Sequence, residues 1–248
     1  DIEIHSKEGT GTSVTLTFSF RVSGVKKDIE EIREQEHERI TDRRIVLIAE
    51  DQQDLNRLES KQLAQHVGVL PQKHSAPPDF KVRDLVGYGR MPYQKWYSKN
   101  SGEDEKVIDW ALEVTGTASL QDKLIQECSG GESQRVWIAT VLSQQPEILF
   151  LDEPTTYLDI SHQLETMHLV RKLNRESGIG VVMVLHDLGQ ALEISDRIVV
   201  MKNGRKYCEG TPQEVITQKM MKDVYDVDCQ IVRIPGREKP LIAYREII

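Results

Sequence analysis

The segment from Cys128 to Asp159 constrains this sequence most, because it joins a capped, glycine-rich helix start to an apolar strand that ends in two acids. Ser129 and Glu132 have the spacing of a capping box, in which a hydroxyl and a carboxylate each bind a backbone N–H group at the start of a helix. Gly130 and Gly131 follow the cap and let an external group approach the amides at the positive end of that helix. The sequence therefore predicts a helix start that can bind an anion.

The second half of the same segment is a short apolar strand that delivers carboxylates. Residues Ile148 to Leu151 are apolar and lead directly into Asp152 and Glu153. Strand ends of this kind place a magnesium ligand and a general base beside a nucleotide in open α/β sheets. Successive strand residues point to opposite faces, so we expect the two acids to have different roles. Either feature alone is common in ordinary folds, and their combination at this spacing predicts a phosphate-binding site.

This segment resembles the ATP-binding subunit of ABC transporters. The resemblance makes Ser129 to Arg135 the signature motif, Asp152 the Walker B magnesium ligand and Glu153 the base that polarises the attacking water. Thr156 to Asp159 corresponds to the D-loop. The run from Ile160 to Glu165 is similar to the subgroup that serves importers of iron-siderophore, haem or vitamin B12 type.

Two more strand ends fit this resemblance. Residues His66 to Gln72 are predicted as a strand that ends in the Q-loop glutamine, which touches magnesium or water in the family. Gly180 to Leu185 is predicted as a buried strand that ends in His186, the H-loop histidine that reaches the γ-phosphate. A single glutamine or histidine at a strand end is more often structural, and only the order of the motifs supports a functional role.

The resemblance implies ATP and Mg²⁺ as cofactors. By residue, it implies catalytic roles for Glu153 and His186, nucleotide contacts for Gln72, Ser129, Gly130, Gly131, Glu132 and Asp159, and magnesium contacts for Asp152 and Gln72.

The expected fold class is α/β, with an incomplete P-loop NTPase-like sheet of the ABC ATPase type and a helical subdomain, preceded by a β-hairpin and a charged helical linker. Four segments are predicted. Residues 1–24 resemble the C-terminal hairpin of a histidine-kinase ATPase domain, 25–43 form the linker, 44–53 resemble the first strand of a receiver domain, and 54–248 form an ABC ATPase fragment from the Q-loop onward. Phe80 to Gly89 and Glu105 to Val114 are the predicted helices of the subdomain.

Composition limits the partners. The net charge of −8 gives no basic surface for nucleic acid or anionic lipid, and no apolar run is long enough to insert into a membrane. The three cysteines have no paired spacing, which fits a reducing compartment. We therefore expect a cytoplasmic protein that reaches the inner or cell membrane only through transmembrane permease subunits and that pairs with a second ATP-binding subunit.

One expected motif is absent from the sequence. A nucleotide site of this kind needs a Gly-rich loop with a lysine, and the sequence contains no Gly-Lys-Ser or Gly-Lys-Thr. The nearest matches begin at Gly24 and Gly204, and neither lies between a buried strand and a helix. Three interpretations stay open: an ABC importer subunit truncated before the Q-loop and not hydrolytic alone, a non-catalytic partner that gives its signature motif in trans, and a two-component signalling fragment.

Overall fold

The computed structural model describes residues 3–6, 12–15, 60–94, 101–203, 205–237 and 239–247. Strand β1 (Glu3–Ser6) pairs antiparallel with β2 (Thr12–Thr15), as expected for a hairpin near the start of the chain. The linker predicted at 25–43, the receiver-like strand at 44–53 and the boundary at residue 54 lie outside the described residues.

A parallel sheet forms the centre of one compact unit, which spans residues 60–190. Its order is β3 (Val67–Leu70), β4 (Ile148–Asp152) and β5 (Gly180–Val184). Leu70 pairs with Leu151, and Leu151 pairs with Met183, so all three strands end at the same edge. The strand predicted at His66 to Gln72 is one residue too long at its start, because His66 ends helix α1 (Ser60–His66), and two residues too long at its end, because β3 stops at Leu70.

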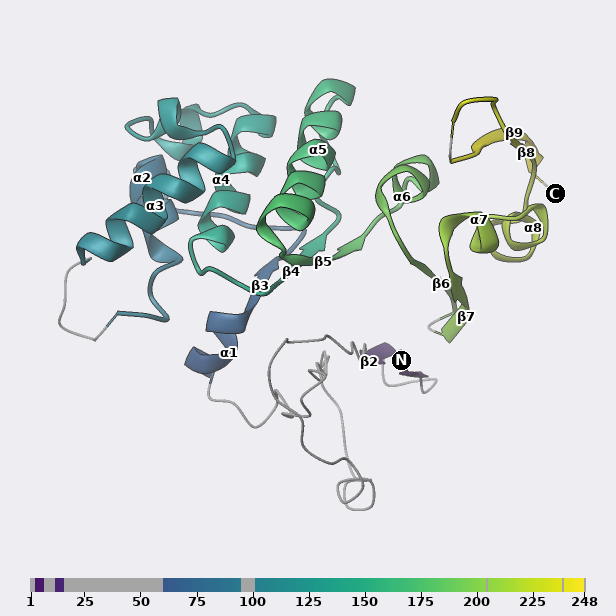
Figure 1. The fold of residues 1–248 in the computed structure, drawn as a ribbon, viewed down its shortest axis with the longest axis horizontal. Coiled ribbons are helices and arrows are strands. Elements are labelled where there is room, and N and C mark those ends of the chain that lie inside the picture. Colours follow the sequence, from purple (N-terminus) through teal and green to yellow (C-terminus); the bar gives the residue numbers. More distant parts are fainter. Residues whose placement is uncertain are drawn as a thin grey trace, which may run out of the picture. The chain divides into compact units, whose positions relative to one another are not determined.

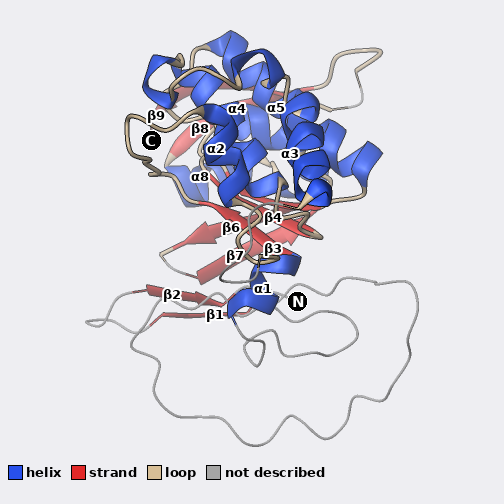
Figure 2. Ribbon diagram, turned by 90° about the vertical axis from the view of Figure 1, so that its left-hand side faces the viewer, coloured by secondary structure: helices blue, strands red, loops and turns tan. Residues whose placement is uncertain are grey.

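Two long helices pack with this sheet. Helix α4 (Gly130–Leu142) and helix α5 (Ile160–Ser177) lie on the same side of the strands in Figures 1 and 2. The apolar positions of α4 are buried, as the sequence pattern predicts. The sheet and α4 approach closely at Gly68, where a Cβ atom would lie 2.4 Å from Val141 Cγ1.

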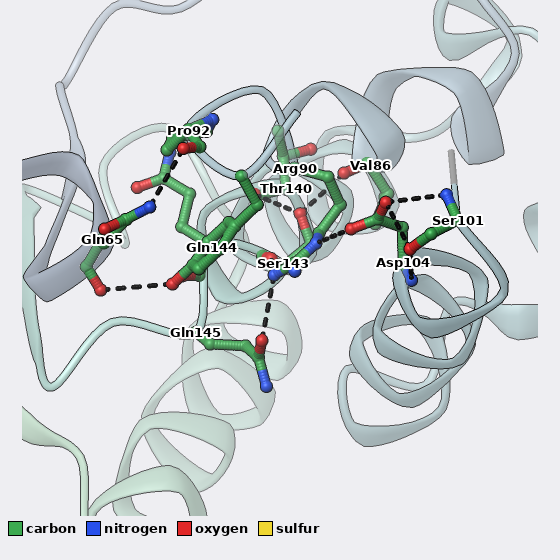
Figure 3. Close-up of polar contacts among 11 residues, drawn as sticks. Gln65, Val86, Arg90, Pro92, Ser101, Asp104, Thr140, Ser143, Gln144 and Gln145 are labelled. Carbon is green, nitrogen blue, oxygen red and sulfur yellow. Dashed lines mark hydrogen bonds and ion pairs between the residues drawn. The ribbon is translucent and has the colours of Figure 1, made fainter. Parts of the chain in front are cut away.

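The helical subdomain of this unit contains α2 (Val82–Tyr88) and α3 (Gly102–Val114), followed by the short 3-10 turns η2 (Ala118–Leu120) and η3 (Ile125–Glu127). A buried arginine connects it to the end of α4 (Figure 3). Arg90 Nε donates to Asp104 Oδ1 at 2.8 Å, and its Nη1 donates to the carbonyl oxygen of Ser143 at 2.8 Å. The subdomain is therefore joined to α4 by a buried charge as well as by apolar packing.

Residues from Ala191 onward belong to a second compact unit. Helix α6 (Leu188–Ile194) leads into it. The elements that follow are β6 (Ile198–Lys202), β7 (Arg205–Gly210), α7 (Pro212–Val215), α8 (Gln218–Tyr225), β8 (Val227–Val232) and β9 (Leu241–Ile247). Strands β6 and β7 pair as an antiparallel hairpin, and a proline stands at the start of α7. Across the described ranges, no helix has the length and apolarity needed to span a bilayer.

Candidate functional site at the carboxyl ends of the parallel strands

Three predicted site residues meet where the parallel strands end. Gln72 follows β3, Glu153 follows β4 and His186 follows β5. Gln72 Nε2 donates a hydrogen bond to Glu153 Oε2 over 2.5 Å, and His186 Nε2 contacts Glu153 Oε1. The sheet thus brings together side chains from three distant parts of the sequence around one carboxylate.

The backbone at Glu153 gives the two neighbouring acids different surroundings. Strand β4 ends at Asp152, and Glu153 has a φ of 49°, in the left-handed region. Its amide donates to the carbonyl oxygen of Val184 at 3.1 Å. The Glu153 side chain is only 14% exposed, whereas Asp152 is exposed and makes no side-chain hydrogen bond within the described chain. From the sequence, strand alternation is expected to point the two acids in different directions. In the structure a tight turn at Glu153 separates them instead.

The Glu153 carboxyl has a pKa below its usual value. Burial raises the pKa, but hydrogen bonds from Thr156, His186 and Gln72 outweigh burial and lower it. Glu153 is therefore ionised at neutral pH. Because an ionised carboxylate only accepts hydrogen bonds, His186 carries its proton on Nε2.

Two polar contacts at this site were missed by the sequence analysis. Thr156 Oγ1 donates to Glu153 Oε2 at 2.9 Å, and the buried Thr155 donates from its Oγ1 to Gln190 Oε1 at 2.8 Å. A threonine three residues after the acid, in a turn, was the available signal for the first contact. No signal in the sequence indicated the contact between Thr155 and Gln190, because helix α6 comes near Thr155 only in the folded chain.

The capping box at the start of α4 is confirmed. Ser129 Oγ accepts from the amide of Glu132 at 3.2 Å, and Glu132 Oε2 accepts from the amide of Ser129 at 2.8 Å. The bond from the Ser129 amide is the main reason that the pKa of Glu132 is lowered. The amides of Gly130 and Gly131 have no partner within the helix, so this turn can donate to an anion.

Asp159 lies at the start of α5 and caps it. Its Oδ1 accepts from the amide of His162 at 2.9 Å and from Ser161 Oγ at 2.8 Å. These hydrogen bonds lower the pKa of Asp159 to about 2. The D-loop residue predicted from the sequence is thus a fixed negative charge.

The residues at this site suit a magnesium ion better than they suit the phosphates of a nucleotide. Asp152, Glu153 and Gln72 offer oxygen donors, and Mg²⁺ in nucleotide sites needs only one or two carboxylates beside the phosphates. Among the residues with described positions, no group of three or more His, Cys, Asp or Glu side chains could hold a metal by itself. The donor set therefore fits an ion that arrives with a nucleotide, and the sequence provides no Gly-Lys-Ser or Gly-Lys-Thr loop for its phosphates.

Comparison with known proteins identifies the family. A family model described as ABC transporter matches residues 32–156. The petrobactin import ATP-binding protein FpuC of Bacillus anthracis is 41% identical over 197 residues, which cover 79% of this chain and 72% of that protein. The iron(3+)-hydroxamate import ATP-binding protein FhuC of Bacillus subtilis (strain 168) is 42% identical over 194 residues, covering 78% and 72%.

Among solved structures, cbiO1 of Clostridium perfringens, part of the ABC transporter complex cbiONQ, superposes with a TM-score of 0.55 at 32% identity, covering 65% of this chain and 63% of that one. The chain therefore belongs to the ABC transporter family, among its ATP-binding proteins, as its motifs predict.

Proposed function

We propose that this chain is the ATP-binding subunit of an ABC importer for iron-siderophore complexes. One observation carries the mechanistic part: the ionised Glu153 carboxylate lies between Gln72 and His186 at three adjacent strand ends. The names of FpuC and FhuC, which are import proteins for petrobactin and iron(3+)-hydroxamate, support the substrate class.

In this proposal Glu153 is the general base that takes a proton from water. Its lowered pKa keeps it ionised at neutral pH, and Gln72 and His186 hold its two oxygens. Asp152, exposed at the end of β4, binds magnesium together with Gln72. When a nucleotide is bound, His186, whose side chain is 75% exposed, would exchange its contact with Glu153 for a hydrogen bond to the terminal phosphate, because the proton on Nε2 serves one acceptor at a time. Magnesium and the nucleotide supply charge neutralisation and the phosphoryl group, and the chain supplies the base and its orientation.

The start of α4 serves a nucleotide held by a second subunit. Ser129, Gly130 and Gly131 offer a hydroxyl and amides at the positive end of a 13-residue helix, and Glu132 keeps the turn in shape. The proposed partners are therefore a second ATP-binding subunit and transmembrane permease subunits, through which the protein associates with the cytoplasmic side of the membrane.

A non-hydrolytic role is the second candidate. The sequence has an intact signature turn but no Gly-Lys-Ser or Gly-Lys-Thr, so phosphate positioning and charge neutralisation by that loop are lost together. A chain of this kind can still complete the site of an intact partner in trans. The signalling interpretation depends on residues 1–51, most of which lie outside the described ranges.

The test repairs the chain and then removes the base. Residues 1–53 are replaced by the corresponding N-terminal segment of FhuC, and ATP binding and phosphate release are measured. We expect Glu153→Gln to lower phosphate release by about 100-fold or more while ATP stays bound. The matched control is Glu176→Gln, an exposed carboxylate near the end of α5.

Equal turnover in the repaired chain and its Glu153→Gln variant would contradict the assignment of the base. The substrate class is tested separately. The repaired chain is expressed in a host that lacks its own siderophore ATPase, and uptake of an iron(3+)-hydroxamate is compared with uptake of vitamin B12. Uptake of vitamin B12 alone would overturn the siderophore assignment.

A further inference from the structure

The ring of His162 lies directly against the signature turn. A Cβ atom on Gly131 would be 1.8 Å from His162 Cδ2 and 2.3 Å from its Cγ, a separation that real atoms do not reach. A Cβ on Gly130 would meet only Leu158 Cδ2, at 3.8 Å, which is ordinary contact. Neither glycine has a positive φ, so the need for glycine at 131 comes from the neighbouring ring and not from the backbone.

Asp159 holds this ring in place. Its Oδ1 accepts from both the amide and the Nδ1 atom of His162, at 2.9 and 2.8 Å. Since Asp159 is ionised at neutral pH, the proton of the imidazole is on Nδ1, and the Cδ2 edge is turned toward Gly131. The position of the ring is therefore set by the helix cap itself.

The next residue of α5 contacts the other part of the site. Gln163 Nε2 donates to the carbonyl oxygens of Leu158 at 3.0 Å and Thr155 at 3.4 Å, in the segment that follows Glu153. Its Oε1 accepts from Gln190 Nε2 at 2.9 Å. The backbone N–H of Gln190 in turn donates to Oδ1 of Asp187, the neighbour of His186, at 2.9 Å. Gln163 thus connects the segments that carry the two proposed catalytic residues.

We propose that the first turn of α5 is the positioning element of the site, with His162 fixing the signature turn and Gln163 fixing the loop between Glu153 and Asp159. The proposal rests on the proposed function for its catalytic consequence. His162 and Gln163 are positioning residues, and neither needs to contact a nucleotide. His162 and Gln163 are adjacent on one helical turn. A shift of the signature turn (Ser129 to Glu132) is therefore coupled to a shift of the segment from Glu153 to Asp159.

The first test uses the whole chain without nucleotide. Hydrogen exchange at the amides of Glu132 and Ser133, which donate to Ser129 Oγ and to the Ser129 carbonyl oxygen, should become about tenfold faster in His162→Ala. His162→Phe keeps a ring on Gly131 but loses the Nδ1 bond to Asp159, so it should restore part of the slow exchange. Gln163→Ala should speed exchange between Thr156 and Leu158 instead. Unchanged exchange in His162→Ala would overturn the proposal, as would a His162→Phe variant that exchanges as fast as His162→Ala.

A double-variant cycle tests the contact itself. Gly131→Ala should lower the melting temperature by about 5 °C through overpacking, Gly130→Ala should not, and adding His162→Ala to Gly131→Ala should restore most of the loss. Additive losses in the double variant would contradict the contact.

The catalytic consequence is tested in the repaired chain. His162→Ala should lower kcat about tenfold with little change in KM for ATP, and His162→Phe should keep kcat within about threefold. If the repaired chain has no turnover at all, the proposed function fails, whereas the exchange and melting measurements still decide the positioning role. Turnover with an unaltered kcat in His162→Ala would overturn that role alone.

Discussion

Gln72 Nε2 and Glu153 Oε2 are 2.5 Å apart, although 81 residues separate them in the sequence. Their meeting follows from the parallel pairing of β3 with β4, which ends both strands at one edge of the sheet. His186 reaches the same carboxylate from the end of β5, on the other side of β4. The geometry around the proposed base is thus built by strand order.

We expect the unaltered chain to release phosphate from ATP no faster than background. The Glu153 cluster supplies a base, but a base alone does not position or neutralise the phosphates, and the sequence has no Gly-Lys-Ser or Gly-Lys-Thr to do so. A steady-state phosphate-release assay with and without Mg²⁺ measures this. Magnesium-dependent turnover that is lost in Glu153→Gln would show that the chain holds ATP by another route.

Arg90→Met should be strongly destabilising. The Arg90 and Asp104 side chains are 5% and 10% exposed and bonded to each other, so removing the arginine leaves a buried carboxylate without its cation. We expect the free energy of unfolding to fall by about 3–5 kcal/mol. Urea unfolding followed by circular dichroism provides the measurement.

The control for this variant is Arg83→Met. Arg83 also contacts two acids, Glu105 and Asp109, but its side chain is 31% exposed. We expect a loss of about 0–1 kcal/mol there, because solvent screens the pair. The double variant Arg90→Met/Asp104→Asn should be more stable than Arg90→Met, since it leaves no unpaired charge. Equal losses in Arg90→Met and Arg83→Met would refute the importance of burial.

Two glycines of the helical subdomain should respond to alanine in opposite directions. A Cβ on Gly89 would lie 2.0 Å from Ser143 Oγ and 2.1 Å from the carbonyl oxygen of Thr140, where the chain after α2 contacts α4. Overpacking there should cost about 1–3 kcal/mol. Nothing lies within 4 Å of a Cβ on Gly102, at the start of α3. Gly102→Ala should stabilise the fold by about 0.4–1 kcal/mol, because it restricts the unfolded chain. Melting curves of both variants distinguish these outcomes.

The sequence predicted those features whose cause is local. The capping box of Ser129 and Glu132 depends on residues three apart, and the acids after Leu151 follow a short apolar run that predicts a buried strand. The comparisons confirm the family resemblance, and the likeness to solved ABC structures confirms the α/β fold class.

Features that depend on tertiary contacts were not predictable in the same way. The left-handed turn at Glu153 is stabilised by a hydrogen bond to Val184, which lies 31 residues later in the chain. The Arg90 bond to Ser143 spans 53 residues. Helix α8 and the hairpin β8–β9 were not predicted at all; each is short, and Met220, Met221 and Cys229 become buried only when these elements pack together. Roles for the site residues remain proposals.

Asp159 should make stability depend on pH in a defined acid window. Its pKa in the folded chain is about 2, below the usual 3.8, mainly because of the hydrogen bond from the amide of His162. A depressed folded-state pKa stabilises the protein fully above the unfolded value, and this stabilisation is lost as the pH falls from 3.8 toward about 2. Asp159→Asn keeps an oxygen that can cap α5 but does not ionise. The difference in urea midpoint between the unaltered chain and Asp159→Asn should therefore be constant above about pH 5 and shrink steadily as the pH falls toward about 2. A difference that stays the same across that range would show that the charge of Asp159 does not contribute to the stability of the helix start.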